Sequence, residues 1–144
     1  IYDALDLNPQ RIGHGIRAAL DPTLMRELIE RNIALEVCPV SNECTGAVPR
    51  LADHPLPRLI AAGVPLTLSS DDPAMFHTSV TREYEVAHEV LGVPTKTLIK
   101  LAREGFKRGF MDEELRRKLL GKFDHEARKW CNTRQIKYPE SVDS

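Results

Sequence analysis

Short apolar runs alternate with segments of helical spacing along the first hundred residues. The run 11–15 ends in glycines and predicts a strand that finishes in a tight loop. The run 34–38 is β-prone and closed by Pro39, and Val64–Ser69 predicts a third strand. A polar loop is predicted after Pro39, through Ser41, Asn42 and Gly46. These patterns predict three strands separated by longer connections.

Helical spacing follows each predicted strand. Asp21 can cap a helix that begins at Pro22, because an aspartate oxygen accepts a free amide and proline needs no donor there. A second helix is predicted over about Pro55–Ala62, and a third follows Pro73. The three predicted apolar faces are Leu24, Met25, Leu28 and Ile29; Leu56, Leu59 and Ile60; and Val80, Tyr84, Ala87 and Leu91.

The alternation of strand and helix is typical of parallel βα units, so the fold class is predicted as α/β. Beyond Gly92 two further helices are predicted, capped by Thr95 and Asp112. The last of them buries Leu115, Leu119, Phe123 and Trp130, and residues 133–144 form a polar tail. Three βα units cannot close a barrel, which usually takes about 250 residues. Some further segment must therefore cover the open sheet edges.

Composition and charge limit the classes of binding partner and the cellular compartment that we expect. The chain has 144 residues, 20 Lys plus Arg and 21 Asp plus Glu, so its net charge of −1 offers no basic surface for nucleic acid or a membrane. No apolar run approaches the roughly 20 residues that span a bilayer. Three cysteines without Cys-x-x-Cys spacing predict reduced thiols and a cytoplasmic protein. The start at Ile1, close to a strand, suggests a fragment.

Two polar motifs occupy equivalent places, each where a predicted parallel strand ends. They are Gly13-His14-Gly15 and Ser70-Asp71-Asp72-Pro73. Active sites of parallel barrels form at that end of the strands. Each motif alone also fits a simple turn or helix start. Together they place one carboxylate that could bind zinc, at about 2 Å, near a histidine that could orient an activated water, which suits hydrolysis.

Three stretches in order resemble the adenosine deaminases of the amidohydrolase group. They are Arg11-Ile12-Gly13-His14-Gly15; Leu35-Glu36-Val37-Cys38-Pro39 with Ser41-Asn42; and Ser70-Asp71-Asp72-Pro73 with Phe76 and Glu83-Tyr84. His54-Pro55 and Ala62-Gly63-Val64 also resemble the family. The resemblance runs from about Arg11 to Trp130. It implies the sixth, seventh and eighth βα units and terminal helices of a (β/α)8 barrel, over residues 1–132, with a tail over 133–144.

The resemblance also implies a role for each motif. Asp71 resembles the family's zinc-ligating aspartate, which also aims the attacking water, and Asp72 resembles the aspartate that hydrogen-bonds a purine ring nitrogen. His14 resembles the catalytic histidine beside the attacking water. The implied reaction is zinc-dependent hydrolytic deamination of a purine nucleoside, adenosine to inosine and ammonia, or of a close aminopurine.

Several family residues have no counterpart in this sequence. The family needs a His-x-His pair, a later histidine and a nearby glutamate, and the remaining histidines lack this spacing. We interpret these histidines as structural: His54, His77, His88 and His125. Cys38 is interpreted as a core or loop thiol, and Tyr84 as core. We therefore expect the chain alone to be inactive, with the N-terminal half of the barrel as its partner.

Two alternatives stay open at this point. The chain could be a non-catalytic module derived from such an enzyme, which the absence of an N-terminal half in the gene would favour. It could also act on adenine, an N6-modified adenine nucleotide or an aminofutalosine. The preference for adenosine rests on the resemblance alone.

Overall fold

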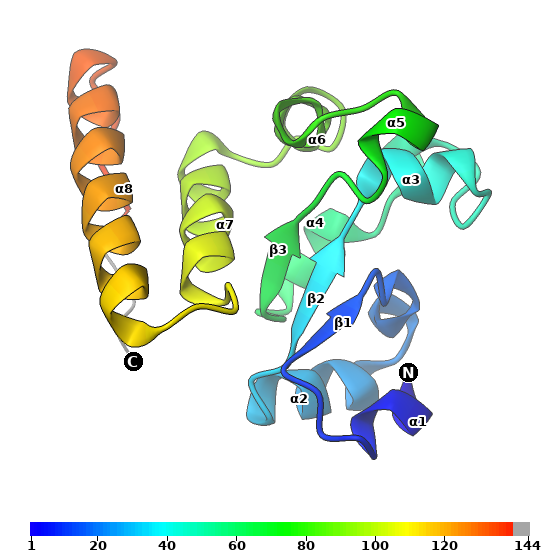
Figure 1. The fold of residues 1–144 in the computed structure, drawn as a ribbon. Coiled ribbons are helices and arrows are strands. Elements are labelled where there is room, and N and C mark those ends of the chain that lie inside the picture. Colours follow the sequence, from blue (N-terminus) through cyan, green and yellow to red (C-terminus); the bar gives the residue numbers. More distant parts are fainter. Residues whose placement is uncertain (140–144) are drawn as a thin grey trace. The chain divides into compact units, whose positions relative to one another are not determined.

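The computed structural model describes residues 1–139, which divide into two compact units. The first unit, Ile1–Val93, holds the sheet and both polar motifs. The second unit begins at Pro94 and holds the two terminal helices. Figure 1 shows the three strands side by side, with α4 behind β2 and β3.

The sheet has three parallel strands in the order β1-β2-β3, as predicted. They are β1 (Arg11–Gly13), β2 (Ala34–Val37) and β3 (Leu66–Leu68). Leu35 of β2 lies opposite Ile12 on one side and Leu66 on the other. β3 is shorter than the predicted Val64–Ser69. The carbonyl of Pro65 accepts a ladder bond from the Leu35 amide, but Pro65 has no N–H to donate, so the strand begins only at Leu66.

Helices fill the connections of the first unit. α2 begins as predicted, because Asp21 Oδ1 accepts the backbone amides of Thr23 and Leu24, both at 3.0 Å. The helices are α1 (Tyr2–Leu5), α2 (Pro22–Glu30), α3 (Pro39–Cys44), α4 (Leu56–Ala61), α5 (Pro73–Phe76) and α6 (Val80–Glu89), with 3-10 turns η1 (Ile16–Leu20) and η2 (Leu51–Asp53).

Three details of the helix prediction are wrong. The predicted polar loop after β2 begins with α3, in which Pro39 occupies the first position, where a missing N–H costs nothing. α6 ends at Glu89, so Leu91 lies beyond the helix on whose face it was predicted. Ile29, predicted on the buried face of α2, is 39% exposed.

The core lies between the sheet and the helices of the first unit. Leu28 of α2, Leu35 of β2, and Leu56 and Leu59 of α4 are each fully buried. Burial of such a side chain is worth about 1.5–3 kcal/mol. Tyr84 of α6 is only half-buried, and this burial raises the pKa of its hydroxyl to about 12. This core fixes the strand ends from which the polar motifs project.

The second unit is a pair of packed helices, α7 (Thr95–Lys107) and α8 (Glu113–Thr133). Phe106 of α7 contacts Phe123 of α8, with ring centroids 5.3 Å apart. Asp112 caps α8 as predicted, accepting the Leu115 amide at 2.8 Å. The predicted cap of α7 is wrong, because Thr95 is already the first helical residue and offers no cap bond. Trp130, predicted in the core, is 40% exposed.

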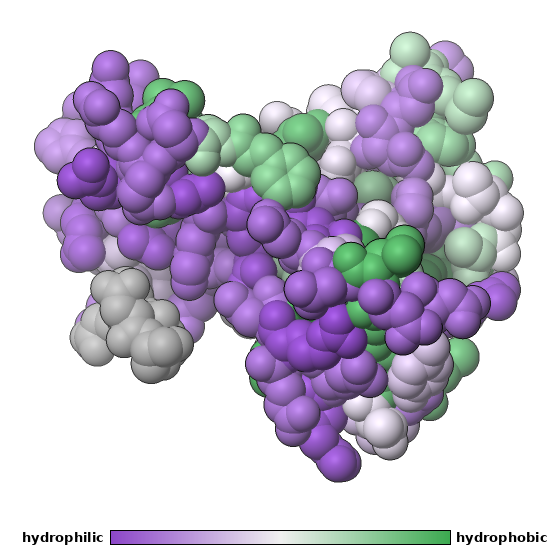
Figure 2. All heavy atoms as spheres, turned by 60° about the horizontal axis from the view of Figure 1, so that its bottom comes forward, coloured by the Kyte–Doolittle hydropathy of each residue, from purple (hydrophilic) through white to green (hydrophobic). Residues whose placement is uncertain are grey.

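Hydrophilic side chains cover most of the face in Figure 2, and hydrophobic ones gather in small patches between them. Within residues 1–139, every helix is too short or too polar to cross a membrane. The predicted tail begins where α8 ends, at Thr133, and its last five residues, 140–144, lie outside the described part. The boundary between residues 132 and 133 stays a prediction.

Candidate active site

His14 projects from the loop directly after β1. The hydrogen-bond ladder between β1 and β2 extends to His14, because the His14 N–H donates to the Glu36 carbonyl at 2.9 Å. His14 and Gly15 both have left-handed backbone, with φ of 56° and 64°. A side chain at position 15 would meet Leu35 Cδ2 at 2.7 Å, so glycine is required there. Left-handed backbone is uncommon for a histidine, and such strain concentrates at functional sites.

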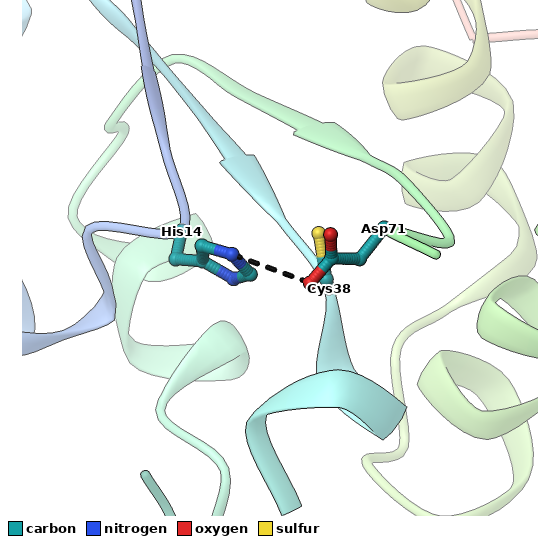
Figure 3. Close-up of side chains that lie close together, drawn as sticks. All are labelled: His14, Cys38 and Asp71. Atoms are coloured by element: carbon teal, nitrogen blue, oxygen red, sulfur yellow. Dashed lines mark ion pairs between the residues drawn. The ribbon is translucent and has the colours of Figure 1, made fainter. Parts of the chain in front are cut away.

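Asp71 follows β3 and also has left-handed backbone, with φ of 57°. Its Oδ2 accepts the Ser41 hydroxyl at 2.7 Å and lies 3.4 Å from His14 Nε2. Figure 3 shows the two side chains pointing toward one another from the ends of β1 and β3. The prediction that His14 and Asp71 converge on one edge of the sheet is confirmed.

Cys38 completes a cluster of three potential metal ligands. One ligand atom each of His14, Cys38 and Asp71 lies within 4.8 Å of the others. The thiol comes from the end of β2, between the other two strands (Figure 3). Burial, with the nearby charge of Asp71, raises its pKa to about 11, so without a metal it is a neutral thiol at pH 7. This agrees with the interpretation of Cys38 as a core thiol.

The donor types in this cluster fit a zinc ion. Carboxylate oxygen, imidazole nitrogen and thiolate sulfur are the ligands that zinc takes in proteins. The side chains of His14 and Asp71 are 42% and 36% exposed, and the bond from Ser41 orients the Asp71 carboxylate. Hydrogen-bonded support of a ligating carboxylate is a usual feature of such sites.

A cavity of about 330 Å³ opens beside His14 and Asp71. Its size lies at the lower end of the range for small-molecule sites, about 300–1,000 Å³. Ser41, Asn42 and Thr45 give it one polar wall, and Arg17 brings a positive charge. The apolar side chains that line it are Ile1, Ile16 and Ala47. The cavity therefore offers both apolar surface and hydrogen-bonding groups.

Asp72, the predicted purine contact, caps a helix in this structure. Its Oδ1 accepts the Met75 amide of α5 at 2.9 Å. The residue is exposed and is not part of the cavity wall described above. Its role toward a purine stays a prediction.

Sequence reasoning missed the roles of Ser41 and Asn42. Asn42 Nδ2 lies 3.2 Å from His14 Nδ1, and Asn42 Oδ1 lies 3.1 Å from His54 Nε2. Both amide atoms of Asn42 are thus used inside the site. The signal was present in the order of the Ser41-Asn42 and His54-Pro55 motifs, but a predicted loop gave no direction to these side chains.

The interpretation of His54 and His88 as histidines that support the fold is confirmed by their contacts with the backbone. His54 is 3% exposed, and its Nδ1 accepts the Leu56 amide at 3.1 Å at the start of α4. His88 Nδ1 lies 2.9 Å from the Val93 carbonyl. Burial lowers the pKa of His54 to about 4, so its ring is neutral at pH 7.

Glu83 is a third residue whose role the sequence left unassigned. It lies on α6 and is fully buried. Its Oε2 accepts the Val40 amide at 3.1 Å, and its Oε1 accepts the Thr78 hydroxyl at 2.7 Å. The bond to Val40 fixes the first turn of α3, which carries Ser41. Glu83 therefore ties α6 to the helix that supports the site.

We expect Glu83→Ala to lower the free energy of unfolding by about 1–3 kcal/mol, because it leaves the partly buried Val40 amide without its acceptor. Glu83→Gln is the matched control, since its amide oxygen can still accept from Val40 and its amide nitrogen can donate to Thr78. Urea unfolding of the two variants and the unchanged protein measures the difference. Equal stability of Glu83→Ala and the unchanged protein would contradict this role.

Comparison with known proteins agrees with this geometry. The sequence profile of the family described as Adenosine deaminase matches residues 1–126. An adenine deaminase of Rhizobium leguminosarum bv. trifolii is 47% identical over 123 residues, covering 85% of this chain and 38% of that protein. An aminodeoxyfutalosine deaminase of Streptomyces coelicolor is 43% identical over 131 residues, covering 90% of this chain and 34% of that protein.

Solved structures give the same result for the fold. The crystal structure of adenine deaminase from Arthrobacter aurescens matches with a TM-score of 0.82 and 34% identity, covering 88% of this chain and 39% of that one. The described βα units thus form part of an amidohydrolase barrel, as predicted. The chain spans less than two fifths of the length of these relatives. With most of its length matched by the family profile, the chain belongs to the adenosine deaminase family.

Proposed function

We propose that this chain forms part of the active site of a zinc-dependent hydrolase that removes the exocyclic amino group of a 6-aminopurine. The observation that carries the proposal is the pair His14 Nε2 and Asp71 Oδ2, 3.4 Å apart beside a cavity. The pair lies at the carboxyl ends of parallel strands, where barrel enzymes build their sites. A structural turn histidine would not need an aspartate from another strand beside it.

Each residue has a distinct part in the proposed chemistry. When bound, zinc lowers the pKa of a coordinated water to about 7 and so supplies a nucleophile at neutral pH. Asp71 would hold the metal, and the Ser41 hydroxyl keeps its Oδ2 in place. His14 would form a hydrogen bond from Nε2 toward the attacking water. Asp72 would receive or donate the hydrogen bond to a purine ring nitrogen.

We propose that the remaining ligands come from the longer protein to which this segment corresponds. Catalytic zinc usually takes three protein ligands, and Asp71 supplies one of them. His14 and Cys38 lie within reach, but the proposal keeps His14 for the water and Cys38 as a thiol. The N-terminal half of the barrel would bring the other ligands and the group that protonates the purine. A cytoplasmic enzyme remains our prediction.

The relatives bear on which aminopurine is the substrate. The sequence alone favoured adenosine, whereas the similar proteins are named adenine deaminase and aminodeoxyfutalosine deaminase. We therefore propose adenine or an adenine-bearing compound with a larger N9 substituent, and keep adenosine and N6-modified adenine nucleotides as candidates. Arg17 lines the cavity and would favour a substituent that carries a negative charge.

Release of ammonia from adenine, adenosine and aminodeoxyfutalosine, and of methylamine from N6-methyl-AMP, tests this proposal in the enzyme that carries this chain. We expect turnover of at least one of them. Arg17→Ala should raise KM about ten- to a hundredfold for an anionic substrate, the scale of one lost hydrogen bond to a charged group, and leave adenine unaffected. Arg17→Lys, which keeps the charge, is the matched control.

The non-catalytic alternative makes the opposite prediction. A module derived from such an enzyme would release no ammonia or methylamine from any of the four compounds, even when zinc is supplied and the whole protein is present. That result would overturn the proposed function while leaving the family membership intact.

A further inference from the structure

A line of buried hydrogen bonds leads from the start of α4 to His14. It runs from the Leu56 amide to His54, from His54 to Asn42, and from Asn42 to His14. Asn42 and His54 are only 3% exposed, so the two bonds of His54 are shielded from bulk water. The line reaches the ring nitrogen of His14 that faces away from Asp71.

The Leu56 amide, at the start of this line, fixes which atom donates and which accepts in every later bond. A backbone N–H can only donate, so His54 Nδ1 must accept from Leu56, which lies 3.1 Å away. The ring of His54 is neutral at pH 7, because burial lowers its pKa to about 4. A neutral ring with an accepting Nδ1 carries its proton on Nε2.

The orientation of Asn42 follows from that tautomer. His54 Nε2–H requires an acceptor, and Asn42 Oδ1 lies 3.1 Å from it. The NH₂ group of Asn42 then faces His14 Nδ1, at 3.2 Å. An NH₂ group can only donate, so His14 Nδ1 must accept, and the proton of a neutral His14 belongs on Nε2.

We propose that Asn42, oriented by His54, is a positioning residue that holds His14 as the Nε2–H tautomer, so that His14 meets the reacting water as a hydrogen-bond donor. The inference rests on the proposed function in one respect, namely that the group facing His14 Nε2 is the reacting water. The tautomer itself follows from contacts within the first unit. His14 then stabilises negative charge at the nucleophile with an N–H, and does not take up a proton at Nε2.

The tautomer of His14 can be read by NMR of the ring nitrogens in the ¹⁵N-histidine-labelled enzyme, without substrate. We expect the unchanged protein to show a bare Nδ1 and a protonated Nε2 at His14. Asn42→Asp replaces the NH₂ donor that faces His14 by a carboxylate oxygen, which only accepts, so His14 Nδ1 should become protonated. A protonated Nδ1 in the unchanged protein, or a bare Nδ1 in folded Asn42→Asp, would overturn the inference.

Two variants of His54 provide a matched pair. His54→Gln places an amide NH₂ where Nε2 was and can still donate to Asn42 Oδ1, but it has no acceptor at the place of Nδ1, so His14 should keep its tautomer. His54→Asn places its oxygen where Nδ1 was and can accept from Leu56, but it cannot reach Asn42, so the fixed preference at His14 should be lost. The same tautomer in both variants would overturn the role of His54, and this pair serves if Asn42→Asp does not fold.

Kinetics separate a positioning role from a structural one. Asn42→Asp should lower kcat about ten- to a hundredfold, the usual cost of losing a group that orients a catalytic residue, while KM and zinc content stay unchanged. Unchanged kcat in a variant with the altered tautomer would overturn the catalytic part of the inference. If the unchanged enzyme deaminates no aminopurine and yet shows the expected tautomer, only the proposed function fails.

Discussion

Asp71→Ala is expected to remove bound zinc and activity together. The variant deletes the carboxylate that lies beside His14 and accepts the Ser41 hydroxyl, which is the group proposed to bind the metal. A site that loses a ligand binds its metal poorly. Activity should therefore fall by more than about a thousandfold, the scale seen when an essential catalytic group is lost. Metal analysis of the purified variant, paired with steady-state kinetics, measures both effects.

Asp72→Asn is the matched control for Asp71→Ala. Asn also caps helices well, so the bond from Met75 to position 72 should survive and α5 should stay folded. Zinc should remain, and activity should fall about ten- to a hundredfold through one altered hydrogen bond to the purine. If Asp72→Asn loses zinc and Asp71→Ala keeps it, the two aspartates have been assigned in the wrong order.

His14→Ala should retain zinc and lower kcat by about 10²–10³-fold, as for the loss of one preorganised donor in an active site. Zinc retention follows because the proposal places His14 beside the water and not on the metal. His14 and Asp71 meet across two strand ends, so the variant leaves the Ser41 bond to Asp71 in place. Pre-steady-state measurement of the chemical step, with metal analysis, tests both expectations.

His14→Gln distinguishes a donor from a proton acceptor at this position. The Gln amide nitrogen can occupy a place close to that of Nε2 and donate a hydrogen bond, but it cannot take up a proton at neutral pH. Partial recovery of kcat relative to His14→Ala supports a donor. Equal loss in both variants, or loss of zinc from His14→Ala, would contradict the assigned role.

Local chemistry made much of the fold predictable. Asp21-Pro22 and Asp112 begin helices for reasons that lie within a few residues, and the structure shows their cap bonds. The second and third strands could be placed because each is a short, mainly apolar run, and the first because its segment ends in glycines before a helical stretch. Their carboxyl ends share one edge of a parallel sheet, which is why the meeting of His14 and Asp71 could be expected from the sequence.

The supporting contacts could not be predicted in the same way. Glu83 and Val40 are bonded across 43 positions of sequence, and Asn42 and His14 across 28. Nothing in the local pattern of α3 or α6 indicates such partners. The predicted loop after Pro39 also concealed a helix whose first turn aims Ser41 and Asn42 at the site. Side-chain direction depends on that backbone, so it becomes visible only in three dimensions.

The central claim is that this chain contributes to a zinc-dependent aminohydrolase site, and removal and return of the metal tests it most directly. The enzyme that carries this chain is stripped with a chelator and reloaded with measured amounts of zinc. It is then assayed for release of ammonia from adenine, adenosine and aminodeoxyfutalosine, and of methylamine from N6-methyl-AMP. The account predicts that activity disappears with the metal and returns in proportion to zinc, up to one ion per site. Full deaminase activity in the metal-free protein, or no activity at any zinc content, would contradict it.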